Sequence, residues 1–316
     1  MNKIEFGDCR ETMRRWKEQG IKAQTCVTSP PYYGLRDYGH EGQIGLEETP
    51  EDYIKAMVEV FRCVWDVLED DGTLWLNIGD SYYNYRPGKG QALVKQSVAN
   101  NDQDLPQTCA RRGNKLEGLK EKDLIGIPWM LAFALRADGW YLRQDIIWSK
   151  PNPMPESVQD RCTKAHEYIF LMSKSAKYYF DNESIKEKAI HAGEERSFNS
   201  PKKAMRNVDG NVSTGNEHPD ALPVEVSELK NKRSVWIVNP KPYSGSHFAV
   251  FPTQLIEPCI LAGAPVGGIV LDPFMGSGTT AQVAQDLGRQ YIGCELNPAY
   301  SELQNNRTSQ QSLELA

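Results

Sequence analysis

A short segment near the C-terminus constrains the fold more than any other feature of the sequence. An apolar run at residues 268–272 ends in Asp272, glycines follow at positions 276 and 278, and a helix is expected to begin at Thr279. Glycine adopts positive φ and lets the backbone approach a ligand closely, while a helix N-terminus offers free N–H groups. The segment predicts a strand, turn and helix of an α/β fold, although many such turns use glycine only to change direction.

A second apolar run at residues 291–295 ends in Glu295, 19 positions after Gly276. In nucleotide-binding folds, an acid about 20 residues after the glycine turn binds the ribose hydroxyls. The turn lacks the third glycine of a dinucleotide site and the Gly-Lys-Ser/Thr of a P-loop, so a ligand with a pyrophosphate is disfavoured. We therefore predict S-adenosylmethionine (AdoMet), with its ribose at Glu295 and its methionine moiety beside residues 274–278.

Apolar runs alternate with amphipathic stretches along the chain, as is typical of a parallel sheet flanked by helices. The 316 residues are 40% hydrophobic, which is enough to fill a substantial core. No stretch reaches the roughly 20 apolar residues of a membrane span, so we expect a soluble protein. We predict strands at residues 23–28, 73–78, 141–148, 167–172, 268–272 and 291–295, and helices at residues 51–68, 127–138, 253–261, 279–287 and 298–306.

The cysteines and histidines indicate neither a disulfide framework nor a metal site. The seven cysteines include no Cys-x-x-Cys pair, and the five histidines are scattered along the chain. This pattern is typical of a reducing compartment. We expect a cytoplasmic protein that binds no metal.

The second unusual segment is Ser-Pro-Pro-Tyr at residues 29–32, directly after the predicted strand 23–28. Two prolines stiffen the loop, and the carboxyl edge of an open α/β sheet is where ligands bind. The Ser29 hydroxyl and the Pro30 carbonyl could each accept an N–H bond from an exocyclic amine, while Tyr32 could stack on a nucleobase. The alternative is a plain turn at the end of a strand.

Together these motifs resemble those of DNA amino-methyltransferases of the N4-cytosine/N6-adenine superfamily, over most of the chain. Their order, with Ser-Pro-Pro-Tyr before the glycine turn, is similar to the permuted β group. Residues 4–8 resemble the family's first strand and acidic turn, residues 71–80 and 147–155 its target-base pocket, and residues 247–252 the approach to the cofactor. The resemblance implies an α/β, Rossmann-like AdoMet-dependent methyltransferase sheet with circularly permuted motif order and an inserted target-recognition region.

The resemblance also implies roles for individual residues. The expected catalytic residues are Ser29, Pro30, Pro31 and Tyr32. The expected cofactor-binding residues are Asp8, Phe251, Pro252, Asp272, Phe274, Gly276, Ser277, Gly278, Thr279 and Glu295.

The identity of the methylated base rests on analogy. Serine at position 29 is the form common in N4-cytosine enzymes, whereas Asp or Asn is usual in N6-adenine enzymes. We therefore expect transfer to N4 of a flipped cytosine, with N6 of adenine as the alternative. A non-catalytic AdoMet- or DNA-binding module, and an RNA or small-molecule amine as substrate, are further alternatives.

The charge distribution suggests where duplex DNA would bind. The formal net charge of -6 excludes a general coat for nucleic acid, but residues 81–241 carry 25 Lys and Arg against 20 Asp and Glu. A basic middle block would suit one DNA-binding surface, although solvated charge is an equally ordinary explanation. Candidate DNA contacts are Arg111, Arg112, Lys150, Arg161, Lys202 and Lys203.

The organisation expected from these motifs is one methyltransferase domain with two inserted segments. Its catalytic half spans residues 1–181 and contains a mobile loop at 84–122. Residues 182–235 would form the target-recognition region, residues 236–307 the AdoMet-binding half, and residues 308–316 a tail. By analogy with the family, we expect duplex DNA as the partner, a homodimer, and an accompanying restriction endonuclease.

Overall fold

The computed structural model describes residues 1–35, 39–40, 42–83, 118–190, 195–196, 224–225, 227–240 and 251–309. By its internal contacts, the chain divides into two compact units. The first unit consists of Met1–Asp181 together with Arg233–Ala316, and the second is Asn182–Lys232. All strands of the main sheet belong to the first unit.

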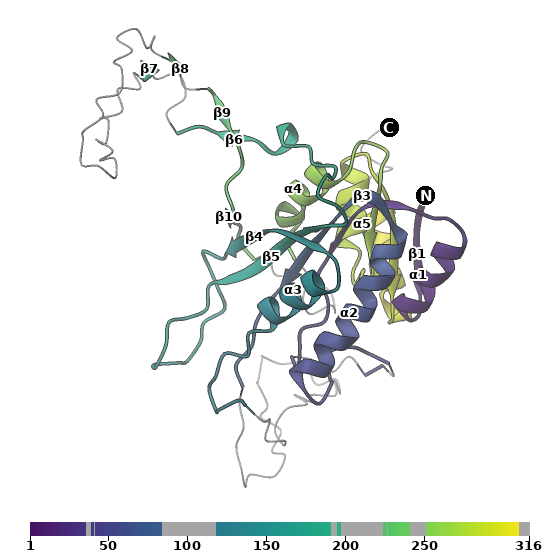
Figure 1. The fold of residues 1–316 in the computed structure, drawn as a ribbon, viewed down its shortest axis with the longest axis vertical. Helices are drawn as coiled ribbons and strands as arrows, with labels where there is room; N and C mark the ends of the chain where they lie inside the picture. The colour runs from purple at the N-terminus through teal and green to yellow at the C-terminus, as the bar shows by residue number, and fades with distance from the viewer. Residues whose placement is uncertain are drawn as a thin grey trace, which may run out of the picture. The chain divides into compact units, whose positions relative to one another are not determined.

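A mixed sheet of eight strands forms the centre of the first unit (Figure 1). One strand, β5, is antiparallel to both of its neighbours, and the other pairs are parallel. The order across the sheet is β1 (Asn2–Phe6), β12 (Gln290–Glu295), β11 (Ile269–Asp272), β2 (Ala23–Thr28), β3 (Leu68–Ile78), β5 (His166–Ser173), β4 (Tyr141–Ser149) and β10 (Val235–Ile237).

The sheet order brings the two sequence motifs to the same edge. β11 pairs in parallel with β2, so the glycine turn after β11 and the Ser-Pro-Pro-Tyr loop after β2 both leave the carboxyl edge. β1, the first strand of the chain, is purple in Figure 1 and lies beside β12, the last strand, which is yellow. The predicted α/β fold is therefore confirmed, and its neighbouring strands β11 and β2 come from opposite ends of the sequence.

Two rows of helices pack on the sheet. Contacts link α1 (Cys9–Glu18), α2 (Pro50–Val67) and α3 (Ile127–Ala137) in one row, and α4 (Thr253–Gly263), α5 (Thr279–Asp286) and α6 (Ser301–Ser309) in the other. Successive side chains of β3 point to opposite faces of the sheet, so the two rows of helices cover opposite faces. Leu74 and Leu76 pack in the core with α2, whereas the Trp75 ring lies against Gly263 of α4. None of the helices in the described ranges is long and apolar enough to cross a bilayer.

Most predicted elements agree with the structure to within a few residues, but the predictions missed the edge strand β10, and three further elements differ. The predictions omitted α1, whose buried side chains lie three or four positions apart among charged residues. β3 begins at Leu68 rather than at 73, because pairing with β2 continues past its exposed acidic residues. The expected tail from 308 starts inside α6, where the Thr308 hydroxyl donates to the Gln304 carbonyl.

The second unit contains short strands. β6 (Glu187–Lys188) pairs with β9 (Leu229–Lys230), and β7 (Glu195–Arg196) pairs with β8 (Val224–Glu225). Of the loop expected at residues 84–122, residues 84–117 lie outside the described part of the chain. Its final part is ordered by a hydrogen bond from the Lys122 N–H to the Tyr83 carbonyl.

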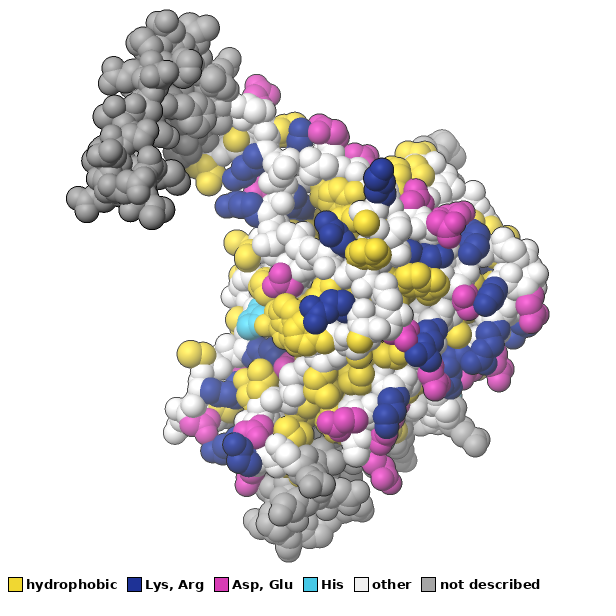
Figure 2. All heavy atoms as spheres, in the orientation of Figure 1, with side chains coloured by type: hydrophobic (Ala, Val, Ile, Leu, Met, Phe, Trp, Pro, Cys, Tyr) yellow, Lys and Arg dark blue, Asp and Glu magenta, His cyan; other side chains and the backbone are white. Residues whose placement is uncertain are grey.

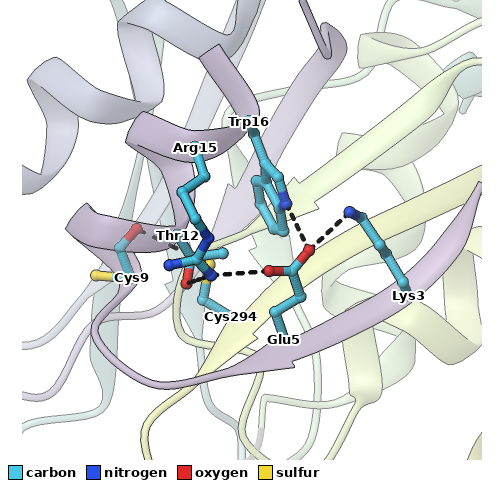
Figure 3. Close-up of polar contacts among 7 residues, drawn as sticks. All are labelled: Lys3, Glu5, Cys9, Thr12, Arg15, Trp16 and Cys294. Atoms are coloured by element: carbon cyan, nitrogen blue, oxygen red, sulfur yellow. Dashed lines mark hydrogen bonds and ion pairs between the residues drawn. The ribbon is translucent and has the colours of Figure 1, made fainter. Parts of the chain in front are cut away.

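A cluster of polar contacts holds β1 against α1 (Figure 3). One oxygen of the Glu5 carboxylate accepts from Lys3 Nζ at 2.7 Å and from Trp16 Nε1 at 2.8 Å, and the other accepts from Arg15 Nη2 at 2.9 Å. Partial burial acts to raise the pKa of Glu5, but these three donors outweigh it and lower the pKa to about 2. The ionised carboxylate therefore stabilises the attachment of the first strand.

The substitution Glu5→Gln is expected to destabilise the protein by about 1–2 kcal/mol at neutral pH, after allowance for solvent screening. A depressed carboxyl pKa stabilises the fold above the unfolded-state pKa, and that contribution is lost as pH falls through the folded-state value. Urea unfolding of both proteins should therefore give a difference that is constant above about pH 5 and shrinks toward about pH 2. Equal stability at neutral pH would contradict this role of Glu5.

Candidate active site

A cavity of about 530 Å³ lies at the carboxyl edge of the parallel strands in the first unit. Its wall includes Asp8, the Ser-Pro-Pro-Tyr loop at 29–32, Asp272 to Ser277, Thr279 and Glu295. Residues from β3 and β4 and the start of β5 complete it at the other end. One continuous space is therefore bordered by both of the motifs that the sequence singled out.

The glycine turn has the backbone conformation that its sequence predicts. Gly276 and Gly278 have φ of 53° and 87°, and Gly278 is the residue that caps α5 at its N-terminus. An added Cβ at Gly278 would lie 3.3 Å from the Gln304 Cα, so α6 packs closely on the turn. The Gln304 side chain also donates to the Gly276 carbonyl at 2.7 Å. Gln304 therefore supports the glycine turn, although no sequence pattern predicted this role.

Asp272 joins the two motifs at the end of β11. Its buried carboxylate accepts from the Thr28 and Thr280 hydroxyls, both at 2.6 Å, and from the Phe274 N–H at 3.0 Å. Burial raises the pKa of Asp272 to about 6, although these three donors act to lower it. Because Thr28 directly precedes Ser29, this carboxylate fixes the position of the Ser-Pro-Pro-Tyr loop relative to the glycine turn.

Glu295, at the end of β12, braces the glycine turn from the other side. Its carboxylate accepts from the Gly276 N–H at 2.7 Å and from the Asn297 N–H at 2.8 Å. Burial raises the pKa of Glu295, while these backbone hydrogen bonds act in the opposite direction. A carboxylate has about four lone-pair positions, so two such bonds leave Glu295 with acceptor capacity for a ligand in the cavity.

The Ser-Pro-Pro-Tyr loop is held in place from two directions. The Tyr53 hydroxyl of α2 donates to the Pro31 carbonyl at 2.9 Å. The Tyr32 ring lies against Gly79, where an added Cβ would be only 2.6 Å from Tyr32 Cε2. Glycine at position 79 therefore provides the space in which the Tyr32 ring lies.

A polar cluster closes the end of the cavity near Tyr32. The Tyr32 hydroxyl donates to Glu167 Oε2 at 2.8 Å, and Lys150 forms an ion pair with the same carboxylate. The Asn77 side chain donates to the Tyr168 carbonyl at 3.1 Å, and the Lys150 ammonium lies 4.2 Å from the centre of the Trp148 ring. Glu167 was not predicted as a site residue; the available signal was a charged residue at the start of an otherwise apolar strand.

Comparison with known proteins identifies the family. Residues 23–306 match the N6_N4_Mtase family model, described as DNA methylase. The chain is 48% identical over 308 residues to the type II methyltransferase M.SmaI of Serratia marcescens, covering 96% of this chain and 90% of that protein. It is 45% identical to M.Cfr9I of Citrobacter freundii, covering 95% and 85% respectively. The chain belongs to the N6/N4 family of DNA methylases.

Solved structures of methylases share the fold of this N6/N4 methylase. The cytosine-N4-specific PvuII DNA methyltransferase superposes with a TM-score of 0.60 at 16% identity, over 97% of this chain and 86% of that one. The M1.HpyAVI–SAM complex superposes with a TM-score of 0.55 at 17% identity, over 98% and 100%. The predicted superfamily and fold are confirmed.

The cavity wall of this methylase fits AdoMet, the predicted cofactor. The Ser277 hydroxyl is buried in the glycine turn and has no hydrogen-bond partner among the described residues, so a polar ligand there would satisfy it. Glu295 offers carboxylate lone pairs for ribose hydroxyls, and Phe274 and Leu296 add apolar surface. Membership of the DNA methylase family supports this cofactor.

Some of the other predicted site residues of the methylase line the cavity and others do not. Asp8 lines the cavity and also caps α1, accepting from the Arg10 N–H at 2.7 Å. Phe251 lines the cavity, whereas Pro252 lies at the start of α4. Arg161 pairs with Glu156 at 2.6 Å, and Lys150 faces the cavity rather than a separate phosphate-binding surface. Arg111, Arg112, Lys202 and Lys203 lie outside the described residues.

Proposed function

We propose that this methylase transfers the methyl group of AdoMet to the exocyclic N4 amine of a cytosine flipped out of duplex DNA. The observation that carries the proposal is the single cavity bordered both by Ser29 and Pro30 and by the glycine turn with Glu295. A cofactor held at the turn and an amine held at the loop would share that space. Transfer between them needs such proximity and alignment.

The residues of the Ser-Pro-Pro-Tyr loop would make the target amine a better nucleophile. The lone pair of an exocyclic amine is delocalised into the base ring, which makes the nitrogen a poor nucleophile. Ser29 Oγ and the Pro30 carbonyl oxygen each accept one amine N–H, localise the lone pair and orient it. The cofactor supplies an electrophilic methyl group on its sulfonium. No strong base is required before the transfer.

The remaining groups of the cavity hold the two ligands. Tyr32 stacks on the target base, because its ring is already fixed against Gly79. Glu295 accepts hydrogen bonds from the ribose hydroxyls of the cofactor, and Asp8 and Phe251 border the same end. A base inside a duplex cannot enter such a pocket, so the target must leave the helix.

Serine at position 29 favours cytosine over adenine as the target. The cytosine-N4-specific PvuII DNA methyltransferase has the same fold, but at 16% identity this similarity supports the fold alone. The curated relatives are named type II methyltransferases. We propose accordingly that a restriction endonuclease of the same sequence specificity accompanies this protein.

The second unit, Asn182–Lys232, is our candidate for the target-recognition region. It falls within the basic middle block, and cations contacting phosphates would release counterions and make binding strongly dependent on salt. On the face shown in Figure 2, Lys and Arg side chains are interspersed with Asp and Glu over the described residues. The described residues of that face therefore do not form the uniformly basic patch expected of a DNA-binding surface.

Analysis of the product tests the choice of base. The protein is incubated with AdoMet carrying a trideuterated methyl group and with plasmid DNA, which is then digested to nucleosides and examined by mass spectrometry. We expect the label in N4-methyldeoxycytidine. Label in N6-methyldeoxyadenosine would overturn the cytosine assignment, and absence of label from DNA would overturn the enzymatic proposal. The deuterium separates this product from methylation already present in the plasmid.

A further inference from the structure

Lys150 brings a positive charge into the wall of the cavity. Among the described residues that line the cavity, it is the one Lys or Arg side chain. Its ammonium forms an ion pair with Glu167 Oε1 and lies 4.2 Å from the centre of the Trp148 ring. Both members of the ion pair are largely buried, with side-chain exposures of 18% for Lys150 and 16% for Glu167. The cation is therefore held where a ligand in the cavity can reach it.

The other hydrogen-bond donors of this polar cluster are already engaged with the protein. The Tyr32 hydroxyl donates to Glu167 Oε2 at 2.8 Å. The Asn77 amide nitrogen directs its two protons to the Tyr168 carbonyl at 3.1 Å and to Glu167 Oε2 at 3.4 Å. An ammonium carries three protons, and Glu167 takes only one of them. Lys150 therefore keeps donor capacity for a ligand.

The proposed position of the target base directs one of its edges toward Lys150. Ser29 and Pro30 would hold the amine near the backbone of the loop, and the Tyr32 side chain extends from the same loop to its hydroxyl at Glu167. A base that stacks on this ring with its amine at Ser29 points its opposite edge toward the hydroxyl end of the ring. Because Glu167 contacts both the Tyr32 hydroxyl and the Lys150 ammonium, Lys150 lies at that end.

Cytosine and adenine differ at that edge. In cytosine, the ring nitrogen beside the amine-bearing carbon is followed by the C2 carbonyl, whose oxygen O2 accepts hydrogen bonds. In adenine, the corresponding nitrogen is followed by a C2–H group, which accepts none. A donor at that position is satisfied by cytosine and left without a partner by adenine. A site built around such a hydrogen bond discriminates strongly against a base that lacks the acceptor.

We propose that Lys150 donates a hydrogen bond to O2 of the flipped cytosine and thereby selects cytosine over adenine. Lys150 is thus a specificity-determining residue, and Glu167 is the carboxylate that holds it in place. The strand pairing makes this arrangement possible, because Trp148 of β4 lies opposite Glu167 of β5 and Lys150 follows two positions later. The inference rests on the proposed transfer to cytosine N4.

Removing Lys150 in a background without its charged partner tests the proposal. Lys150→Met alone would leave a buried carboxylate unpaired, so Glu167→Gln serves as the parent protein and Lys150→Met is added to it. Second-order rate constants for methyl transfer at saturating AdoMet are measured on a duplex with the mapped target cytosine and on the same duplex with adenine there. Adding Lys150→Met should slow transfer to cytosine roughly 10- to 100-fold, and transfer to adenine less than about threefold.

Binding to an abasic duplex separates a base contact from a phosphate contact. With S-adenosylhomocysteine present, the affinity of both proteins is measured for the target duplex and for the same duplex with an abasic site in place of the cytosine. Loss of a base contact should weaken binding of the cytosine duplex alone, whereas loss of a phosphate contact would weaken both equally. AdoMet affinity, measured by calorimetry, should be the same in both proteins.

Lys17→Met is the matched control for this substitution. It removes an exposed lysine that pairs with Asp66 at 2.9 Å outside the cavity. Added to the wild-type protein, it should leave the transfer rates and both affinities unchanged.

The inference is overturned if adding Lys150→Met leaves the rate on cytosine unchanged, or lowers the rates on cytosine and adenine by the same factor. Equal weakening of the cytosine and abasic duplexes would also overturn it, and this comparison decides even where the adenine duplex takes no measurable label. Either failure in a protein that produces N4-methyldeoxycytidine removes only the role of Lys150. Label in N6-methyldeoxyadenosine with the wild-type protein would instead remove the proposed transfer to cytosine.

Discussion

Replacing Ser29 with alanine is expected to slow methyl transfer about 10²- to 10³-fold, the loss typical of one oriented hydrogen-bonding group in an active site. Alanine cannot accept the amine N–H, so the lone pair of the target nitrogen stays delocalised. Single-turnover transfer of labelled methyl to plasmid DNA measures the rate. AdoMet affinity should be unchanged, because the groups that brace the glycine turn are Asp272, Glu295 and Gln304.

The half-buried Ser175 provides a matched control for this substitution. Its hydroxyl donates to the Lys177 carbonyl outside the cavity, so Ser175→Ala should retain the wild-type transfer rate. Full activity of Ser29→Ala would contradict the assignment of Ser29. A loss of AdoMet affinity in that variant would show instead that the substitution disturbs the whole cavity.

Glu295→Gln is expected to weaken AdoMet binding about 10- to 100-fold, because hydrogen bonds to charged groups contribute roughly 1.5–3 kcal/mol. The amide that replaces one carboxylate oxygen would face a backbone N–H, either of Gly276 at the turn or of Asn297. It would also remove an acceptor for the ribose. Calorimetric titration of AdoMet into the protein without DNA measures the effect.

A neighbouring glutamate serves as the control for Glu295. Glu302 lies exposed in the first turn of α6, so Glu302→Gln should bind AdoMet as the wild type does. Wild-type affinity in Glu295→Gln would mean that the cofactor does not depend on this carboxylate. The predicted place of the ribose would then be wrong.

The sequence predicted the parts of the fold and site that depend on local patterns. The glycine turn and the strands around it follow from residue types at short spacing, and so does the loop at 29–32. Helix α1 was missed because its few buried residues, Cys9, Thr12, Met13 and Trp16, stand among charged ones. Asp8, the N-cap residue, was the signal for this helix, whereas Asp8 was predicted to bind the cofactor.

Contacts between distant residues could not be predicted in the same way. The Thr28–Asp272 hydrogen bond spans 244 positions, and the Tyr32–Glu167 bond spans 135. Both depend on the order of strands in the sheet, which places β11 beside β2 and turns β5 antiparallel. Lys150 illustrates the consequence: its charge suggested a phosphate contact, and the fold gives it a carboxylate partner in the cavity wall.

The central claim is that one cavity holds the cofactor and the target amine together. A crystal structure of the protein with sinefungin, a non-reactive analogue of AdoMet, and a duplex containing its mapped methylation site tests this most directly. We predict that the target cytosine lies outside the helix, with its N4 within hydrogen-bond distance of Ser29 Oγ and the Pro30 carbonyl oxygen. A target base that remains stacked in the duplex, or an amine directed away from Ser29, would contradict the claim.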